Sequence, residues 1–214
     1  MGYITRSLEK DVRQVTQEYP VVLVTGPRQV GKTTMLQKLM EGTSRGYVSL
    51  DDLNERVLAK NDPELFLQLH KPPVLIDEVQ YAPELFPYIK VYADTYHEPG
   101  AFWLTGSQVF KLMRGVQESL AGRVAVLSMT SLSQAEINGV DTEPFRVDLE
   151  ALLKREDKAV PADTKGIFER IYKGSMPAIA SGKNTNSQIF YSSYLSTYIE
   201  RDVKELSDAI DALK

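Results

Sequence analysis

Short runs of consecutive apolar residues recur along the first part of the chain, and each run ends at small, polar or acidic side chains. Apolar runs of this length without polar alternation are typical of parallel strands that are covered on both faces. The runs that predict strands are Val21–Thr25, Tyr47–Asp51, Val74–Asp77, Phe102–Gly106 and Ala125–Met129.

Between most of these runs, apolar residues recur instead at helical spacing. The segments with this period are Thr33–Met40, Leu53–Lys60, Leu85–Tyr96 and Val109–Glu118, and a shorter amphipathic segment, Ser7–Glu18, precedes the first strand. Strands that alternate with helices predict βαβ units and a largely parallel, five-stranded sheet, so the expected fold class is α/β.

The pattern changes after Met129, where no further strand is predicted. Ser133 and Glu136 have the spacing of a capping box at the start of a helix. Helical spacing then recurs over Leu149–Glu156, Lys165–Lys173 and Gln188–Leu206. The sequence therefore predicts two parts, an α/β core over residues 1–130 and a helical region over residues 131–214.

The first predicted strand runs into a turn with the spacing G-x-x-x-x-G-K-[ST], the Walker A phosphate loop. The turn and the threonine after it comprise Gly26, Pro27, Arg28, Gln29, Val30, Gly31, Lys32, Thr33 and Thr34. A turn between a strand and a helix directs backbone N–H groups and a helix N-terminus at one point, which attracts phosphate. In such a loop Lys32 reaches the β- and γ-phosphates and the Thr33 hydroxyl binds Mg²⁺. The flanking strand and helix argue against a chance match, so we expect ATP and Mg²⁺ as ligands.

The third predicted strand ends in two carboxylates, which is the Walker B pattern. Asp77 is placed to hold Mg²⁺ through water, and Glu78 to act as the general base on an attacking water. The alternative is a strand that ends in a solvated acidic turn. Two more acids, Asp51 and Asp52, follow the second strand, where a helix cap is favoured over a contribution to the metal site.

Two further side chains are candidates for catalysis. Ser107 follows the fourth strand, which is expected to lie between the Walker A and Walker B strands as a sensor strand, and Thr105 is the second candidate there. In ATPases with such an extra strand, a polar residue at this place contacts the γ-phosphate or the attacking water. Arg123 precedes the fifth strand and is a candidate for stabilising phosphate charge, in its own subunit or a neighbouring one. A surface salt bridge is the alternative for Arg123, and Arg114 is the competing arginine.

Composition narrows the classes of function. The 214-residue chain has a net charge of −4, which argues against a grip on nucleic acid by the whole surface but not against a local basic patch. The chain has no cysteine, which excludes disulfides, cysteine zinc sites and thiol catalysis, and its 2 histidines argue against a histidine metal cluster. No apolar run approaches the roughly 18 residues of a membrane span. The N-terminus lacks the apolar region of a signal peptide, so a cytoplasmic location is expected.

Taken together and in this order, the motifs resemble a known family, the prokaryotic AAA+-type ATPases that carry a C-terminal domain of unknown function. The resemblance rests on the phosphate loop and on Leu50–Asp52, Ile76–Gln80, Leu104–Ser107 and Leu120–Arg123, and the segments Gly174–Pro177 and Tyr198–Val203 are similar to the family's linker. Members usually continue well beyond this point. The resemblance therefore implies that a chain ending at Lys214 lacks most of the second domain, together with any partner recognition that resides there.

The hypothesis that accounts for most of these residues is an ATPase that acts as a nucleotide-driven switch, with ATP and ADP as ligands. Two alternatives remain open: an ATP-binding interaction module with little turnover, associated with a protein or with DNA, and a small-molecule kinase. Glu78 directly follows Asp77, which favours activation of water over transfer to an acceptor. A homo-oligomer is a further expectation of the resemblance.

Overall fold

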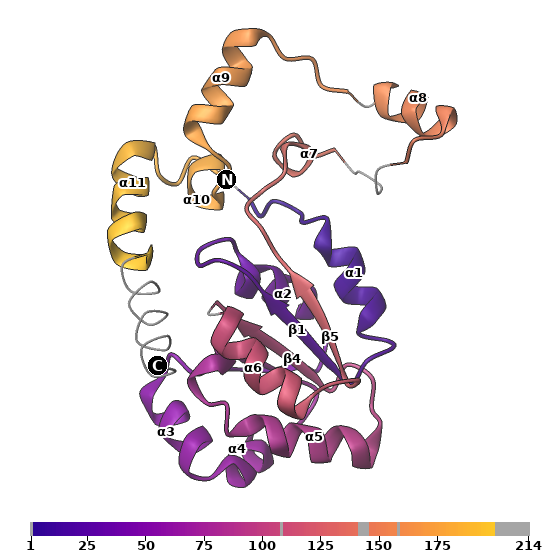
Figure 1. The fold of residues 1–214 in the computed structure, drawn as a ribbon, viewed down its shortest axis with the longest axis vertical. Helices are drawn as coiled ribbons and strands as arrows, with labels where there is room; N and C mark the ends of the chain where they lie inside the picture. Colours follow the sequence, from indigo (N-terminus) through magenta and orange to yellow (C-terminus); the bar gives the residue numbers. More distant parts are fainter. Residues whose placement is uncertain (1, 108, 141–145, 158, 200–214) are drawn as a thin grey trace, which may run out of the picture. The chain divides into compact units, whose positions relative to one another are not determined.

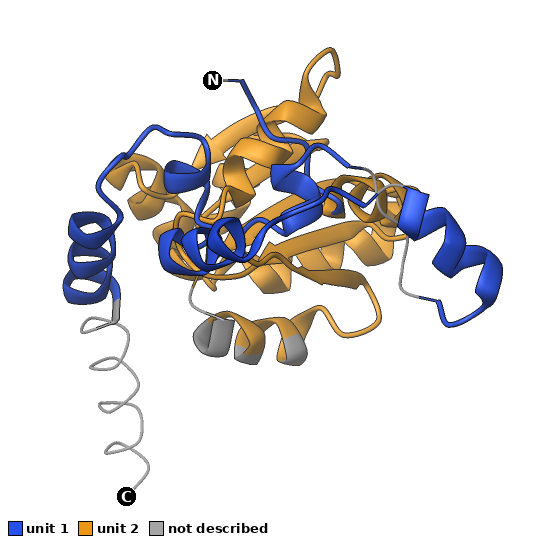
Figure 2. Ribbon diagram, turned by 90° about the horizontal axis from the view of Figure 1, so that it is seen from above, with its two compact units in different colours: residues 1–7, 131–214 blue, residues 8–130 orange. Residues whose placement is uncertain are grey.

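The computed structural model describes residues 2–107, 109–140, 146–157 and 159–199. The chain divides into two compact units, coloured separately in Figure 2. One unit comprises residues 8–130, and the other comprises residues 1–7 together with residues 131–214. The first seven residues therefore group with the C-terminal segment, which no local sequence pattern indicates.

The unit of residues 8–130 is built on a five-stranded parallel sheet with the strand order β2-β3-β4-β1-β5 (Figure 1). The strands are β1 (Val21–Thr25), β2 (Gly46–Ser49), β3 (Val74–Asp77), β4 (Phe102–Gly106) and β5 (Val124–Ser128). The predicted α/β class is confirmed, and β4 lies between β3 and β1 as expected of the fourth strand. Every residue of β1, β3 and β4 is buried, so both faces of the central sheet are covered.

The helices of this unit connect the strands or precede them (Figure 1). They are α1 (Leu8–Val15), α2 (Lys32–Met40), α3 (Leu53–Asn61), α4 (Pro63–Leu69), α5 (Leu85–Tyr96) and α6 (Val109–Ser119), with a 3-10 turn, η1 (Val79–Tyr81), after β3. No helix was predicted from the sequence over the residues of α4. In the structure Pro63 is in the first turn of α4, where its missing N–H has no partner to lose, and the Asp62 side chain caps this helix.

The strand predicted over Tyr47–Asp51 ends early, at Ser49. The Asp52 carboxylate accepts hydrogen bonds from the backbone N–H groups of Asn54 and Glu55 and so begins α3. The preference for a helix cap at Asp52 is thereby confirmed. The backbone N–H of Asp52 donates to the carbonyl oxygen of Ser49 at 3.2 Å, and this turn ends the strand.

In the second unit, the described residues form helices. They are α7 (Gln134–Ile137), α8 (Leu149–Asp157), α9 (Thr164–Lys173), α10 (Pro177–Ala180), α11 (Ser187–Tyr194) and a π-helical turn, η2 (Leu195–Ile199). The helix predicted over Gln188–Leu206 is confirmed for its first part, and residues 200–206 lie outside the described residues. No helix in the described part of the chain combines the length and the apolar character of a membrane span.

The capping box at α7 anchors the N-terminal residues to this unit. Ser133 and Glu136 make both of its hydrogen bonds, as predicted. The same Glu136 carboxylate accepts from the backbone N–H of Ser7 at 2.7 Å and from Nε of the buried Arg6 at 3.1 Å. Burial alone raises the pKa of Glu136, but the hydrogen bonds from Ser133, Ser7 and Arg6 outweigh it, and the net pKa is lowered.

Stability of this unit should therefore fall in acid. A carboxyl whose pKa is lowered by folding stabilises the native state above its unfolded pKa of about 4.3, and the contribution is lost as the pH falls through the folded pKa. Urea unfolding followed from about pH 6 to about pH 3 should show this loss in the wild-type chain, and Glu136→Gln should flatten it. The matched control is Glu150→Gln, at an exposed glutamate of α8. An unchanged pH dependence in Glu136→Gln would contradict the assignment.

Candidate functional site

The predicted phosphate loop joins β1 to α2 in a conformation that requires glycine at two positions. Gly26 has φ 142° and Gly31 has φ 96°, both in the region that side chains disfavour. A Cβ at Gly26 would also overlap the carbonyl oxygen of Met129, which follows β5. Gly31 is the N-cap of α2 and offers no side chain to its first turn, so the helix N-terminus is left for an external acceptor.

The other loop residues differ in exposure. Pro27 and Gln29 are exposed, as is Thr34 in the first turn of α2, whereas Val30 is buried beneath the loop. Arg28 is partly buried and lies within electrostatic range of Lys32, whose pKa it helps to lower. The exposed members are therefore accessible to a nucleotide from solvent.

Lys32 is the buried cation of the loop, with 5% of its surface exposed. Its Nζ donates hydrogen bonds of 2.9 Å each to the carbonyl oxygens of Gly26 and Pro27. Burial lowers the pKa of Lys32, while the carboxylates of Glu78 and Asp77 oppose that shift. The ammonium is thus held at the loop by neutral acceptors and by the field of two nearby acids.

The two residues predicted to hold Mg²⁺ lie side by side. The Thr33 hydroxyl donates to Oδ1 of Asp77 at 2.7 Å, although the two residues come from different elements. The hydroxyls of Thr105 and Tyr47 also bond to Asp77, the latter at 3.4 Å. Among the described residues, no three His, Cys, Asp or Glu side chains are grouped so that they could hold a metal alone. Mg²⁺ is commonly held by one or two carboxylates together with substrate phosphates, so Thr33 and Asp77 fit an ion shared with a nucleotide.

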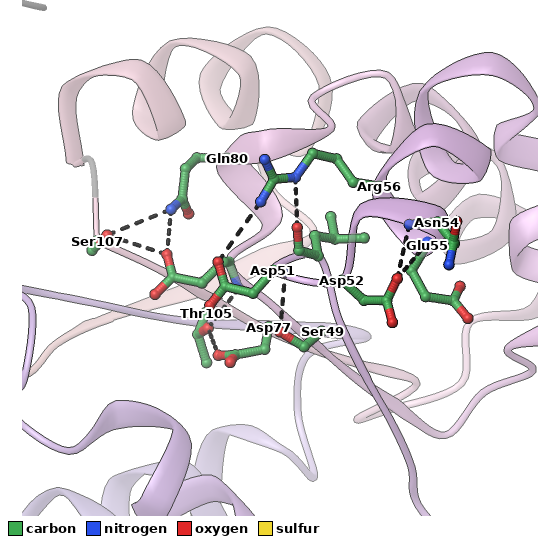
Figure 3. Close-up of polar contacts among 12 residues, drawn as sticks. Ser49, Asp51, Asp52, Asn54, Glu55, Arg56, Asp77, Gln80, Thr105 and Ser107 are labelled. Atoms are coloured by element: carbon green, nitrogen blue, oxygen red, sulfur yellow. Dashed lines mark hydrogen bonds and ion pairs between the residues drawn. The ribbon is translucent and has the colours of Figure 1, made fainter.

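Glu78 stands in a left-handed backbone conformation, with φ 57° and ψ 44°. Its N–H donates to the Thr105 hydroxyl at 3.1 Å, and its Oε2 accepts from the Ser107 hydroxyl at 3.2 Å. Gln80 completes a triangle, because its Nε2 donates to the same Oε2 and lies 3.5 Å from the Ser107 oxygen (Figure 3). The two residues predicted at the end of β4 thus bond to the Walker B acids, Thr105 to Asp77 and Ser107 to Glu78.

Sequence reasoning assigned no role to Gln80 or Arg56. Gln80 was noted only as part of a motif, and its position two residues after Glu78 was the available signal. Arg56 donates from Nε to the carbonyl oxygen of Leu50 at 2.7 Å (Figure 3). Its guanidinium lies over the Tyr81 ring, 3.9 Å from the ring centroid. The contact pairs a residue of α3 with the turn after β3, which no local pattern predicts.

Asp51 lies close enough to the site to respond to its charges. Burial raises the pKa of Asp51, the carboxylates of Glu78 and Asp77 raise it further, and Arg56 opposes them. The side chain is largely exposed, and Arg56 lies 3.8 Å from Asp51 as its ion-pair partner. Asp51 therefore lies within electrostatic range of Asp77 and Glu78 but is paired with Arg56.

Arg123 lies apart from this group. Its carbonyl oxygen accepts from the N–H of Val21, at the amino end of β1, while the phosphate loop follows the carboxyl end. A five-residue strand is about 16 Å long, more than an arginine side chain bridges. The guanidinium instead forms a two-point ion pair with Asp94 of α5, with one contact of 3.0 Å. This geometry favours the salt-bridge alternative for Arg123 over a role within the same subunit. The side chain of the competing Arg114 lies outside the described residues.

Comparisons with known proteins show the family to which the chain is similar. A family model described as an AAA domain matches residues 18–138, more than half of the chain. The uncharacterized proteins Rv2008c of Mycobacterium tuberculosis and Mb2031c of Mycobacterium bovis are each 29% identical to it over 202 residues, or 94% of the chain. The match covers 40% of those relatives, so the chain spans less than half of their length.

Two solved structures share the fold. The Walker-type ATPase PABY2304 of Pyrococcus abyssi has a TM-score of 0.57 at 16% identity, with 98% of this chain and 76% of that one covered. AMPPCP-bound DnaA from Aquifex aeolicus has a TM-score of 0.50 at 16% identity, with 94% and 68% covered. The five-stranded parallel sheet with its flanking helices is thus a P-loop NTPase fold, as the sequence predicted.

Replacement of the loop lysine tests the site directly. Lys32→Ala should weaken ATP binding by about 10- to 100-fold or more, because charge-assisted hydrogen bonds to phosphate are lost. Lys38→Ala is the matched control, since Lys38 lies on the same helix but is exposed and paired with Glu41 at 2.6 Å. Calorimetric titration with Mg-ATP measures both. Equal affinity of a folded Lys32→Ala protein and wild type would exclude this loop as the nucleotide site.

The position of Arg123 gives a second prediction. If the ion pair is its role, Arg123→Ala and Asp94→Ala should lower the unfolding midpoint alike and leave ATP turnover per subunit unchanged. A role in a neighbouring subunit gives another result, in which only Arg123→Ala loses turnover. Mixing Arg123→Ala with Lys32→Ala subunits would then restore activity, since each supplies what the other lacks. Steady-state phosphate release across protein concentrations distinguishes the two results.

Proposed function

The chain belongs to the AAA domain family, and on that premise we propose that it binds ATP with Mg²⁺, hydrolyses it and works as a nucleotide-driven conformational switch. The observation that carries the proposal is the convergence of four polar groups at one edge of the sheet. Lys32, Thr33, Asp77 and Glu78 come from two separate segments and meet beside the phosphate loop.

Binding would use the loop and the start of α2. Backbone N–H groups of the loop and the helix N-terminus receive phosphate oxygens, and Lys32 adds a positive charge there. Thr33 and Asp77 would hold Mg²⁺, which supplies charge neutralisation on the phosphates when it is bound. DnaA, which shares the fold, is described with AMPPCP, an ATP analogue, and this supports an adenine nucleotide as the ligand.

Hydrolysis would use the acid next to the metal residue. Glu78 accepts the proton of a water that attacks the γ-phosphate, and Ser107, bonded to that carboxylate, orients the water or contacts the phosphate. Asp77 and Glu78 thereby divide the work, one holding the ion and the other the proton. A kinase would need an acceptor hydroxyl in place of that water.

The switch would involve the helical region of residues 131–214, as a lid or linker. The chain spans 40% of the length of its curated relatives, and we propose that the whole protein has a partner on which the switch acts. A homo-oligomer, and a protein or DNA partner, belong to the same proposal. Phosphate release with ATP alone supports the switch, whereas ATP binding without turnover favours an interaction module.

Substitution of the general base should separate binding from hydrolysis. Glu78→Gln keeps the shape of the side chain and removes its basic oxygen, so Mg-ATP affinity should stay close to wild type. Turnover should fall by about 10²- to 10⁴-fold, the usual contribution of general-base catalysis. Phosphate release at saturating ATP measures the loss, and a wild-type rate in Glu78→Gln would show that another group takes the proton.

The metal residue should give the opposite pattern. Asp77→Asn should weaken the Mg²⁺-dependent part of ATP affinity, because a carboxylate that holds the ion is lost. Asp51→Asn is the matched control, as it removes the same charge nearby from a residue without a hydrogen bond to Thr33. Titration of ATP with and without Mg²⁺ measures both variants. Equal losses in the two would mean that only the local charge matters.

A further inference from the structure

We propose that Gln80 is a positioning residue, whose side-chain amide fixes the carboxylate of Glu78 for attack by water; the inference rests on the ATP hydrolysis proposed above. Gln80 follows Glu78 by two residues, within the 3-10 turn η1, and only 2% of its surface is exposed. Within the described residues its side-chain hydrogen bonds go to Glu78 and Ser107 and not to the phosphate loop, so it would act through Glu78.

The orientation of the amide follows from the chemistry of its neighbours. An ionised carboxylate only accepts hydrogen bonds, so the nitrogen of Gln80, and not its oxygen, has to face Oε2 of Glu78. The two hydrogens of Nε2 are then divided between Glu78 and the Ser107 oxygen, which lies 3.5 Å away. Ser107 in turn donates to Oε2 at 3.2 Å. Two donors hold one carboxylate oxygen, which leaves the other oxygen, Oε1, to accept a proton.

This arrangement is unfavourable for Gln80 itself. Its Oε1 is buried and has no hydrogen-bond partner among the described residues. The oxygen lies against Gly106, where a Cβ would approach it to 2.8 Å. A buried amide oxygen without a donor destabilises a fold, and an apolar side chain of the same length would avoid that cost. Stability alone therefore gives no reason for a glutamine here, whereas a donor to Glu78 does.

The triangle also holds Glu78 on the side of the phosphate loop. Gly106 pairs with Thr25, and the loop begins directly after Thr25, so Ser107 lies at the edge where the loop starts. On the other side of β3 is β2, after which come Asp51 and Arg56. A carboxylate bonded to Ser107 points toward β4 and the loop. The backbone of Glu78, held by Thr105, adds to this restraint.

The test replaces the amide and keeps the length of the side chain. Gln80→Met removes the donors, and kcat for ATP hydrolysis should fall by about 100-fold, the size expected when a catalytic group is misplaced by roughly 1 Å. The KM for ATP and the unfolding midpoint should stay near wild type. Gln80→Glu, which puts an acceptor in place of the donor, should also lower kcat. This variant replaces Gln80→Met in the test if Gln80→Met does not fold. Gln37→Met, at an exposed glutamine of α2, is the matched control and should keep the wild-type kcat.

Combination with the general-base variant separates positioning from structure. If Gln80 acts through Glu78, adding Gln80→Met to Glu78→Gln should lower kcat no further, whereas independent effects would multiply. A full additional loss in the double variant overturns the inference. So does a kcat of Gln80→Met equal to, or higher than, that of wild type, since a higher rate would mean that Gln80 restrains Glu78 in an inactive orientation.

The outcomes distinguish this inference from the proposed function. A wild-type chain that binds Mg-ATP but releases no phosphate overturns both the hydrolysis and the role of Gln80. Turnover that is lost in Glu78→Gln but kept in Gln80→Met overturns the role of Gln80 alone. Turnover lost in both single variants, with unchanged KM and no further loss in the double variant, supports both.

Discussion

The site depends on the parallel register of four strands. Thr25, the last residue of β1, pairs with Gly106 of β4 on one side and with Ser128 of β5 on the other. Asp77 ends β3, next to β4, so the chain leaves all these strands at one edge. Because the carboxyl ends of parallel strands face the same way, groups from distant segments meet without any loop having to reach for them. A slip of one residue would turn these side chains to the opposite face.

Electrostatic balance is the second constraint at this edge. The carboxylates of Glu78 and Asp77 lie close enough to Lys32 to raise its pKa against the effect of burial. Both Lys32 and Asp77 are buried. A buried charge without a partner is expensive, so each depends on the others and on hydrogen bonds to remain charged. Hydroxyl groups of Thr33 and Thr105 supply such bonds to Asp77. This edge of the sheet therefore contains polar side chains that are buried, among them Lys32, Asp77 and Thr105.

The sequence predicted those parts that depend on residues near one another along the chain. Continuous apolar runs located the strands, and the glycine spacing located the phosphate loop, because both patterns are local. Arg56 and the contact of Gln80 with Ser107 were missed, since these partners belong to other elements and only the packing of η1 against β4 and α3 brings them together. The role of Arg123 was left open between its own subunit, a neighbouring one and a surface salt bridge. Its position before β5 was correct, but its partner Asp94 lies on α5, and no local pattern pairs the two residues.

The two hydrogen bonds that Lys32 makes to carbonyl oxygens have a consequence for affinity. Two of the three donors of this ammonium already bind carbonyl oxygens, so a ligand adds one bond at the third donor and gains more only by exchanging carbonyl acceptors for phosphate oxygens. The gain is the difference between the two sets, which is smaller than a sum over phosphate contacts suggests. The exchange also selects its ligand. A neutral or weakly basic acceptor competes poorly with two carbonyl oxygens that are already bound to Lys32. A multiply charged polyphosphate forms stronger, charge-assisted hydrogen bonds and can displace them.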